Sequence, residues 1–144
     1  GQIQSNKLKS ITSWATVIHS LDDPRHFEII ERVAPHRLQI FLQVSLDGQE
    51  GRGGASPAEL AQLADLVNES NNLDLLGLMA VAPLGVEPMK AFADLAQINQ
   101  GFAGRYPNSK FLSAGMSGDF EAAIKNGATH IRVGSSILGS RSPH

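Results

Sequence analysis

The sequence predicts an α/β fold: a (β/α) TIM-type barrel with parallel strands, of which this chain supplies the later units. Five short apolar segments alternate with helical segments at spacings of roughly 25 to 35 residues, the period of a repeated βαβ unit. The apolar segments are nearly continuous and do not alternate with polar residues, which is typical of a parallel sheet covered on both faces. Gly/Ser-rich turns follow the last two segments, where such barrels usually place a phosphate site.

The first elements are short. Residues 5–11 have helical composition, and Ser5 or Asn6 is a plausible cap for them. Residues 16–20 are apolar and β-branched, which predicts a strand. Trp14 lies just before this strand, where we expect it to pack.

The next elements carry clear start signals. Pro24 follows two aspartates, so an N-cap and a proline at the first helical position predict a helix over 26–33. Residues 37–44 form the second predicted strand. The run Ser-Pro-Ala-Glu that begins at Ser56 is a capping box, and apolar residues at helical spacing follow it, so a helix starts there.

The second half of the chain repeats the pattern. The apolar run over 73–81 is bounded by two asparagines and a proline, as a buried strand would be. A long helix with one apolar stripe is expected over 87–105. The remaining expected elements are a strand over 111–113, a helix over 119–126 and a strand over 130–133.

Composition excludes several classes of protein. The 12 basic and 14 acidic residues are well mixed and give a net charge of −2, so no broad positive surface for nucleic acid is expected. The absence of cysteine excludes disulfides, thiolate metal sites and a cysteine nucleophile. No apolar run approaches about 18 residues, so no membrane span is expected. We therefore expect a cytoplasmic protein.

Length limits the fold that this chain can complete. One domain over residues 1–144 is expected, with a sizeable core. A complete barrel of this type has eight units and about 250 residues. Because the chain supplies only about five units, we expect it to be the carboxy-terminal part of a longer protein.

The two Gly/Ser turns predict a bound phosphate. The first lies in the segment Ser-Ala-Gly-Met-Ser-Gly-Asp over 113–119, and the second follows Ile131 in the segment Ile-Arg-Val-Gly-Ser-Ser. Glycine lets the backbone approach an anion, and hydroxyl and backbone N–H groups donate to it. A Gly/Ser turn at the start of a helix is often only a cap, which remains the alternative.

Four segments together resemble the YggS/PROSC-type pyridoxal phosphate homeostasis proteins, which have an alanine racemase N-terminal-like barrel. Besides the two turns, Gln-Ile-Gln-Ser-Asn-Lys over 2–7 and Gly-Leu-Met-Ala-Val-Ala-Pro over 77–83 match motifs of that family in the same order. The resemblance implies a protein that binds pyridoxal 5′-phosphate (PLP) through a Schiff base, without established turnover, and that buffers PLP in intracellular vitamin B6 homeostasis. The family's Schiff-base lysine belongs to a first strand that would precede Gly1.

The resemblance also implies roles for individual residues. Arg132 would point toward the pyridine nitrogen, whereas an arginine in an apolar strand is otherwise a structural ion pair. Methionine is more often a gap filler, and an asparagine before a helical turn is as often a cap. Ser136 is a less secure phosphate contact than its neighbours. The implied cofactor-binding residues are Asn6, Met116, Ser117, Arg132, Gly134 and Ser135.

Other patterns in the sequence give weak evidence, or none, for a catalytic or binding site. His19, Ser20 and Asp22 are too close on one strand to form a nucleophilic triad. The other histidines have no ligand spacing, so no metal site is expected. Arg52, in a Gly-Arg-Gly-Gly loop that lacks the lysine of a P-loop, is a weak candidate for contact with the cofactor rim. The five lysines fall in predicted helices or their flanks, so none is expected to form the Schiff base.

Two functions from other classes stay open. One is a racemase or decarboxylase that uses PLP, although such enzymes usually add a second, β-rich domain after the barrel. The other is a barrel that binds a different phosphorylated small molecule, which the phosphate turns alone permit. We expect a monomer or weak dimer, and a missing amino-terminal segment supplied as a second chain is a possible partner.

Overall fold

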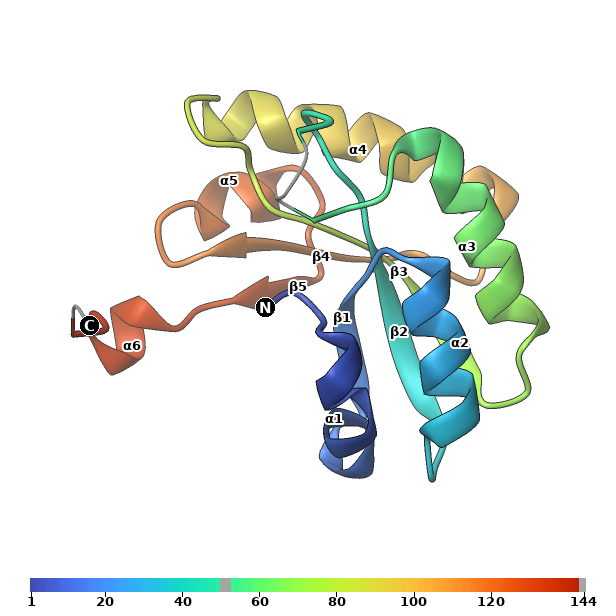
Figure 1. The fold of residues 1–144 in the computed structure, drawn as a ribbon. Helices are drawn as coiled ribbons and strands as arrows, with labels where there is room; N and C mark the ends of the chain where they lie inside the picture. The colour runs from blue at the N-terminus through green and yellow to red at the C-terminus, as the bar shows by residue number, and fades with distance from the viewer. Residues whose placement is uncertain (50–52, 143–144) are drawn as a thin grey trace.

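The computed structural model describes residues 1–49 and 53–142. In this part of the chain, five parallel strands form one sheet in sequence order, each hydrogen-bonded to the next (Figure 1). The strands are β1 (Val17–Leu21), β2 (Leu38–Gln43), β3 (Leu73–Ala80), β4 (Phe111–Met116) and β5 (His130–Arg132). Sequential parallel pairing is the connectivity of a β/α barrel.

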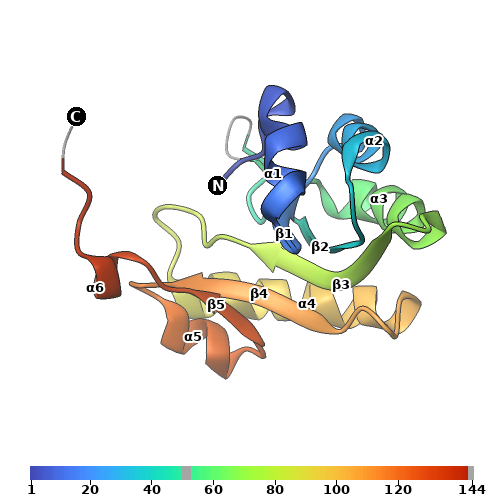
Figure 2. The same ribbon diagram turned by 90° about the horizontal axis from the view of Figure 1, so that it is seen from below.

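The sheet is strongly curled (Figure 2). The ring centroids of Phe41 in β2 and His130 in β5 lie 5.1 Å apart across its concave face, and His19 of β1 stacks on Phe41 at 4.6 Å. Two strands separate β2 from β5, so a flat sheet would hold them about 14 Å apart. The five strands therefore form part of a barrel wall, which confirms the predicted incomplete barrel.

Helices cover the convex face of the sheet (Figures 1 and 2). Buried side chains of the strands, such as Ile40, Leu78 and Leu112, form one hydrophobic core with Leu63 and Leu95 of the helices. The described helices are η1 (Ser5–Lys7), α1 (Leu8–Trp14), α2 (Pro24–Val33), α3 (Pro57–Glu69), α4 (Pro88–Arg105), α5 (Phe120–Lys125) and α6 (Ser135–Leu138). The last of these, α6, projects away from the other helices (Figure 1).

The predicted helix starts of α2 and α3 are confirmed at the atomic level. Ser56 accepts a hydrogen bond from the Glu59 N–H, and the Glu59 carboxylate accepts one from the Ser56 N–H, which completes the capping box. The Asp23 carboxylate accepts from the Arg25 N–H one residue after Pro24. Each cap satisfies backbone donors that the first helical turn leaves free.

Three local predictions are wrong. Ser5 and Asn6 cap nothing, because both lie inside η1, whose N-cap is Gln4. Trp14 does not pack before β1: the helix continues to Trp14, and its side chain is 71% exposed there. Strand β4 continues past Ser113 because Met116 still pairs with Arg132 of β5, so tertiary pairing overrides the local turn signal.

No helix in residues 1–49 and 53–142 is long and apolar enough to cross a bilayer.

Candidate functional site

The candidate site lies where β4 and β5 end. Because the two strands are parallel neighbours, the turns that follow them meet at one edge of the sheet. The backbone N–H groups of Gly134 and Ser136 donate to the Ser117 hydroxyl oxygen at 3.3 and 3.2 Å. Two N–H groups that converge on one oxygen form the kind of donor pair that binds a phosphate oxygen.

The predicted phosphate residues are thus adjacent, with one change of detail. The second N–H group that donates to Ser117 belongs to Ser136. The sequence-based prediction preferred Ser135 to Ser136 as a phosphate contact. Ser135 lies between these two donors and is exposed at the start of α6. Phosphate binding by Ser117, Gly134 and Ser135 stays a prediction, and Ser136 joins the set as a geometric donor.

Arg132 places a half-buried cation beside these turns. Its Nη1 donates to the Ser113 hydroxyl at 2.8 Å and its Nη2 to the Ala80 carbonyl at 3.2 Å, and both partners are neutral. Burial lowers the pKa of the Arg132 guanidinium, an effect that the charge of Asp119 partly offsets, but a guanidinium remains protonated at neutral pH. Over residues 1–49 and 53–142, no carboxylate lies within 4.0 Å of it.

The structural ion pair considered for Arg132 is therefore not found among the described residues. A guanidinium has five N–H donors, and the two contacts above leave several of them for a ligand on the concave side of the sheet. A half-buried cation held only by neutral groups is suited to an electron-rich or anionic partner.

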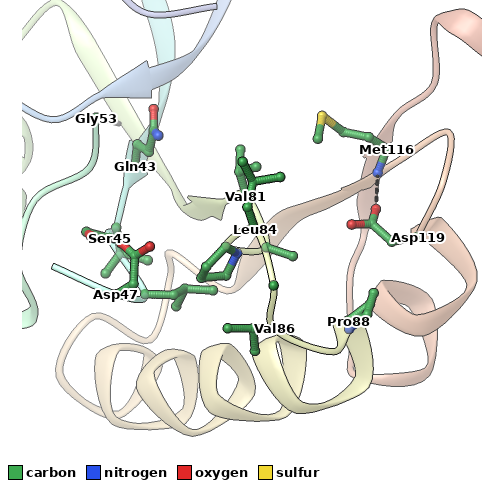
Figure 3. A pocket seen from close by; sticks show the side chains of 15 residues that line it. Gln43, Ser45, Asp47, Gly53, Val81, Leu84, Val86, Pro88, Met116 and Asp119 are labelled. Atoms are coloured by element: carbon green, nitrogen blue, oxygen red, sulfur yellow. Dashed lines mark hydrogen bonds between the residues drawn. The ribbon is translucent and has the colours of Figure 1, made fainter. Parts of the chain in front are cut away.

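A cavity of about 480 Å³ opens at the same edge of the sheet (Figure 3). Its wall is mainly apolar and includes Val81, Leu84 and Met116, with Asp119 at one side. Asp119 accepts a hydrogen bond from the Met116 N–H at 2.8 Å, which closes the turn after β4 (Figure 3). Met116 thus lines a cavity at this edge of the sheet, and its contact with a cofactor stays a prediction.

The cavity and the donor pair do not coincide. Ser117 lines a different, more polar cavity of about 420 Å³, together with Gly118 and Lys125. The N–H pair locates an anion more securely than the apolar cavity does, because apolar walls provide no compensation for the desolvation of a charge. The phosphate is therefore expected at the turns, with the apolar cavity beside it.

Two predicted residues lie outside this cluster. Asn6 is exposed in η1, and no described contact joins it to the turns, so its place near a cofactor stays a prediction. Arg52 lies outside the described residues.

Sequence reasoning missed Ser113 and underrated His19. Ser113 is fully buried, and its hydroxyl lies 2.8 Å from His19 Nδ1 and also accepts from Arg132. Burial, followed by the charge of Arg132, lowers the pKa of His19, so the ring is neutral near pH 7. A serine within an apolar strand was the only sequence signal for this contact.

The rejected triad is indeed not assembled. The Ser20 hydroxyl donates to the Gly1 carbonyl at 2.7 Å, and the Asp22 carboxylate accepts from the Gly54 N–H at 2.6 Å. His19 contacts neither of them among the described hydrogen bonds and bonds instead to Ser113. The Ser20 and Asp22 side chains therefore bond to backbone groups of other segments.

Among the five lysines, Lys125 lines the same polar cavity as Ser117. All five are exposed; Lys110 directly precedes β4, and the others lie in helices: Lys7, Lys9, Lys90 and Lys125. An exposed ammonium keeps its solvation, whereas an amine that forms a Schiff base is desolvated and oriented. That none of these five lysines forms the Schiff base stays a prediction.

A curled sheet of parallel strands in sequence order, with N–H groups that converge after its last two strands, defines part of a β/α barrel. The family model for the alanine racemase N-terminal domain matches residues 1–142, and the chain belongs to this family. The resemblance inferred from the sequence is thereby confirmed.

Two related proteins and one solved structure are similar to this chain over nearly its whole length. The chain is 43% identical to the pyridoxal phosphate homeostasis protein of Corynebacterium glutamicum and 39% identical to that of Mycobacterium leprae, over 98% and 96% of its length. It spans 68% and 59% of those two proteins. It also resembles PipY of Synechococcus elongatus, solved with PLP bound, with a TM-score of 0.85 and 32% identity, covering 96% of this chain and 68% of that chain.

Proposed function

We propose that this chain binds PLP and belongs to a cytoplasmic protein of PLP homeostasis, which holds and delivers the cofactor without turning over a substrate. The observation that carries the proposal is the convergence of the Gly134 and Ser136 N–H groups on Ser117, close in the chain to Arg132, whose described hydrogen-bond partners are neutral. The names of the relatives and the PLP-bound PipY structure support the same ligand.

In this proposal, different residues bind the phosphate and the ring of PLP. The two N–H groups and the Ser117 hydroxyl would hold the phosphate, and Arg132 would hold the pyridine ring of PLP. PLP, when bound, supplies an aldehyde that reacts with amines and a ring that withdraws electrons. A permanently charged guanidinium at the ring nitrogen disfavours protonation of that nitrogen, which weakens electron withdrawal. This arrangement favours storage of PLP over carbanion chemistry.

The direct test is a PLP titration of the full-length protein followed by absorbance. Binding should produce a band near the visible range that a simple phosphate ester lacks, and inorganic phosphate should compete while pyridoxal without phosphate binds more weakly. No spectral change with PLP, combined with tight binding of another phosphorylated molecule, would contradict the proposal and favour a different barrel ligand.

Replacing Arg132 by Glu should alter the environment of the ring more than the hold on the phosphate. Strand alternation puts Arg132 on the same side as Gly134, but its described contacts reach Ser113 and Ala80 and not the turn donors. We expect a shifted PLP absorbance and weaker PLP binding, with little change in the affinity for inorganic phosphate. An unchanged spectrum and unchanged PLP affinity would remove Arg132 from the site.

A further inference from the structure

We propose that Ser113 is a positioning residue, which holds the Arg132 guanidinium in place and fixes His19 as the neutral tautomer that carries its proton on Nε2. The proposal rests on the proposed function, because the guanidinium is positioned for the PLP ring. It concerns three side chains from β1, β4 and β5 that meet on the concave face of the sheet.

The direction of each hydrogen bond follows from the donors available. Arg132 can only donate, so the Ser113 oxygen accepts from Nη1. Ser113 is fully buried, and its only other described side-chain partner is His19 Nδ1 at 2.8 Å. Because a buried hydroxyl proton needs an acceptor, Ser113 donates to Nδ1. The proton of the neutral ring is then on Nε2.

The surroundings hold this arrangement. His19 is stacked on Phe41, with ring centroids 4.6 Å apart, so its ring plane is fixed by packing. The Ala80 carbonyl accepts from Arg132 Nη2 at 3.2 Å, which gives the guanidinium a second anchor on β3. A protonated His19 would put a second cation beside Arg132 and would also lose the acceptor for the Ser113 proton. The network thus keeps Arg132 as the single cation of the three.

The hydrogen bonds of this network should strengthen the binding of the PLP ring by Arg132. A side chain as long as arginine loses rotamer freedom when it binds, and a guanidinium already held at two of its nitrogens has less freedom left to lose. Removing the Ser113 hydroxyl should therefore weaken the hold on the ring and leave the phosphate turns as they are.

The first test needs no substitution. In the ¹⁵N-labelled full-length protein, NMR correlations between the ring nitrogens and carbons of His19 distinguish the two neutral tautomers. We expect the proton on Nε2. A proton on Nδ1 would overturn the proposal, because Ser113 would then accept from both neighbours.

The second test compares serine variants by PLP titration. Ser113→Ala should raise the dissociation constant for PLP about tenfold, the effect of one hydrogen bond to a charged group, and shift the absorbance of the bound ring. The affinity for inorganic phosphate should stay unchanged, and Ser113→Thr, which keeps the hydroxyl, should restore most of the PLP affinity. Ser109→Ala is the matched control, because Ser109 is also buried but donates to the Leu75 carbonyl.

The outcomes separate the two proposals. If the wild-type protein binds no PLP, the proposed function fails, and the role of Ser113 toward the ring fails with it. If the wild type binds PLP and a folded Ser113→Ala variant shows the same spectrum and affinity, only the positioning role is overturned. If Ser113→Ala does not fold, the NMR measurement of the His19 tautomer in the wild type tests the positioning role of Ser113.

Discussion

Gly77→Ala should lower the free energy of unfolding by about 3 to 5 kcal/mol, since it adds both backbone strain and a steric overlap. Gly77 has φ +155° and follows an irregularity in the pairing of β2 with β3. An added Cβ would overlap the carbonyl oxygen of Phe111, its pairing partner on β4, and would lie 2.8 Å from the carbonyl carbon. The two strands would have to separate. Thermal and urea unfolding measure the effect.

A second glycine provides the control. Gly101 lies within α4, and an added Cβ there meets nothing within 4 Å. Gly101→Ala should therefore raise the stability by about 0.5 to 1 kcal/mol, through helix propensity alone. Stability of the Gly77→Ala variant within about 1 kcal/mol of the wild type would mean that β3 and β4 do not approach each other as closely as described.

Ser117→Asp should lower the affinity for PLP by about 100-fold, equivalent to about 2.7 kcal/mol. The new carboxylate would accept the hydrogen bonds that the Gly134 and Ser136 N–H groups now donate to Ser117. It would also place a negative charge where the phosphate is expected, and hydrogen bonds to charged groups are worth about 1.5 to 3 kcal/mol each. The dissociation constant from absorbance or calorimetric titration measures the loss.

Two controls separate the loss of phosphate binding from a general effect of the added charge. Binding of pyridoxal, which lacks the phosphate, should change little in the Ser117→Asp variant. Ser10→Asp adds the same charge at an exposed position of α1 and should leave PLP affinity unchanged. Loss of pyridoxal and PLP binding to the same extent would indicate a general disturbance of the site, and retention of full PLP affinity would remove Ser117 from it.

Much of the secondary structure could be predicted because its signals are local. The capping box at Ser56 and the prolines at the first turns of α2, α3 and α4 act within a few residues of themselves, so their neighbours in the sequence reveal them. Local signals also produced the errors. Helical composition could not show that α1 continues to Trp14, and the turn residues after Ser113 concealed the pairing that extends β4.

For the same reason, only part of the candidate site could be predicted from the sequence. Ser117 and Gly134 belong to turns that are recognisable as Gly/Ser motifs, and the order of parallel strands brings those turns together. His19 and Ser113 meet across 94 residues, and each alone is an ordinary residue of a strand. The fold must be known before such a pair can be found.

The βαβ period, the family and two turns that predict a phosphate site could be inferred from the sequence alone, since each depends on neighbouring residues or on the spacing of similar segments. The curl of the sheet, the neutral partners of Arg132 and the Ser136 N–H as a donor could be known only from the folded chain. The physical reason is that side-chain hydrogen bonds are directional at distances near 3 Å. Such contacts depend on how each strand is rotated and curved, and packing of the whole domain sets that geometry.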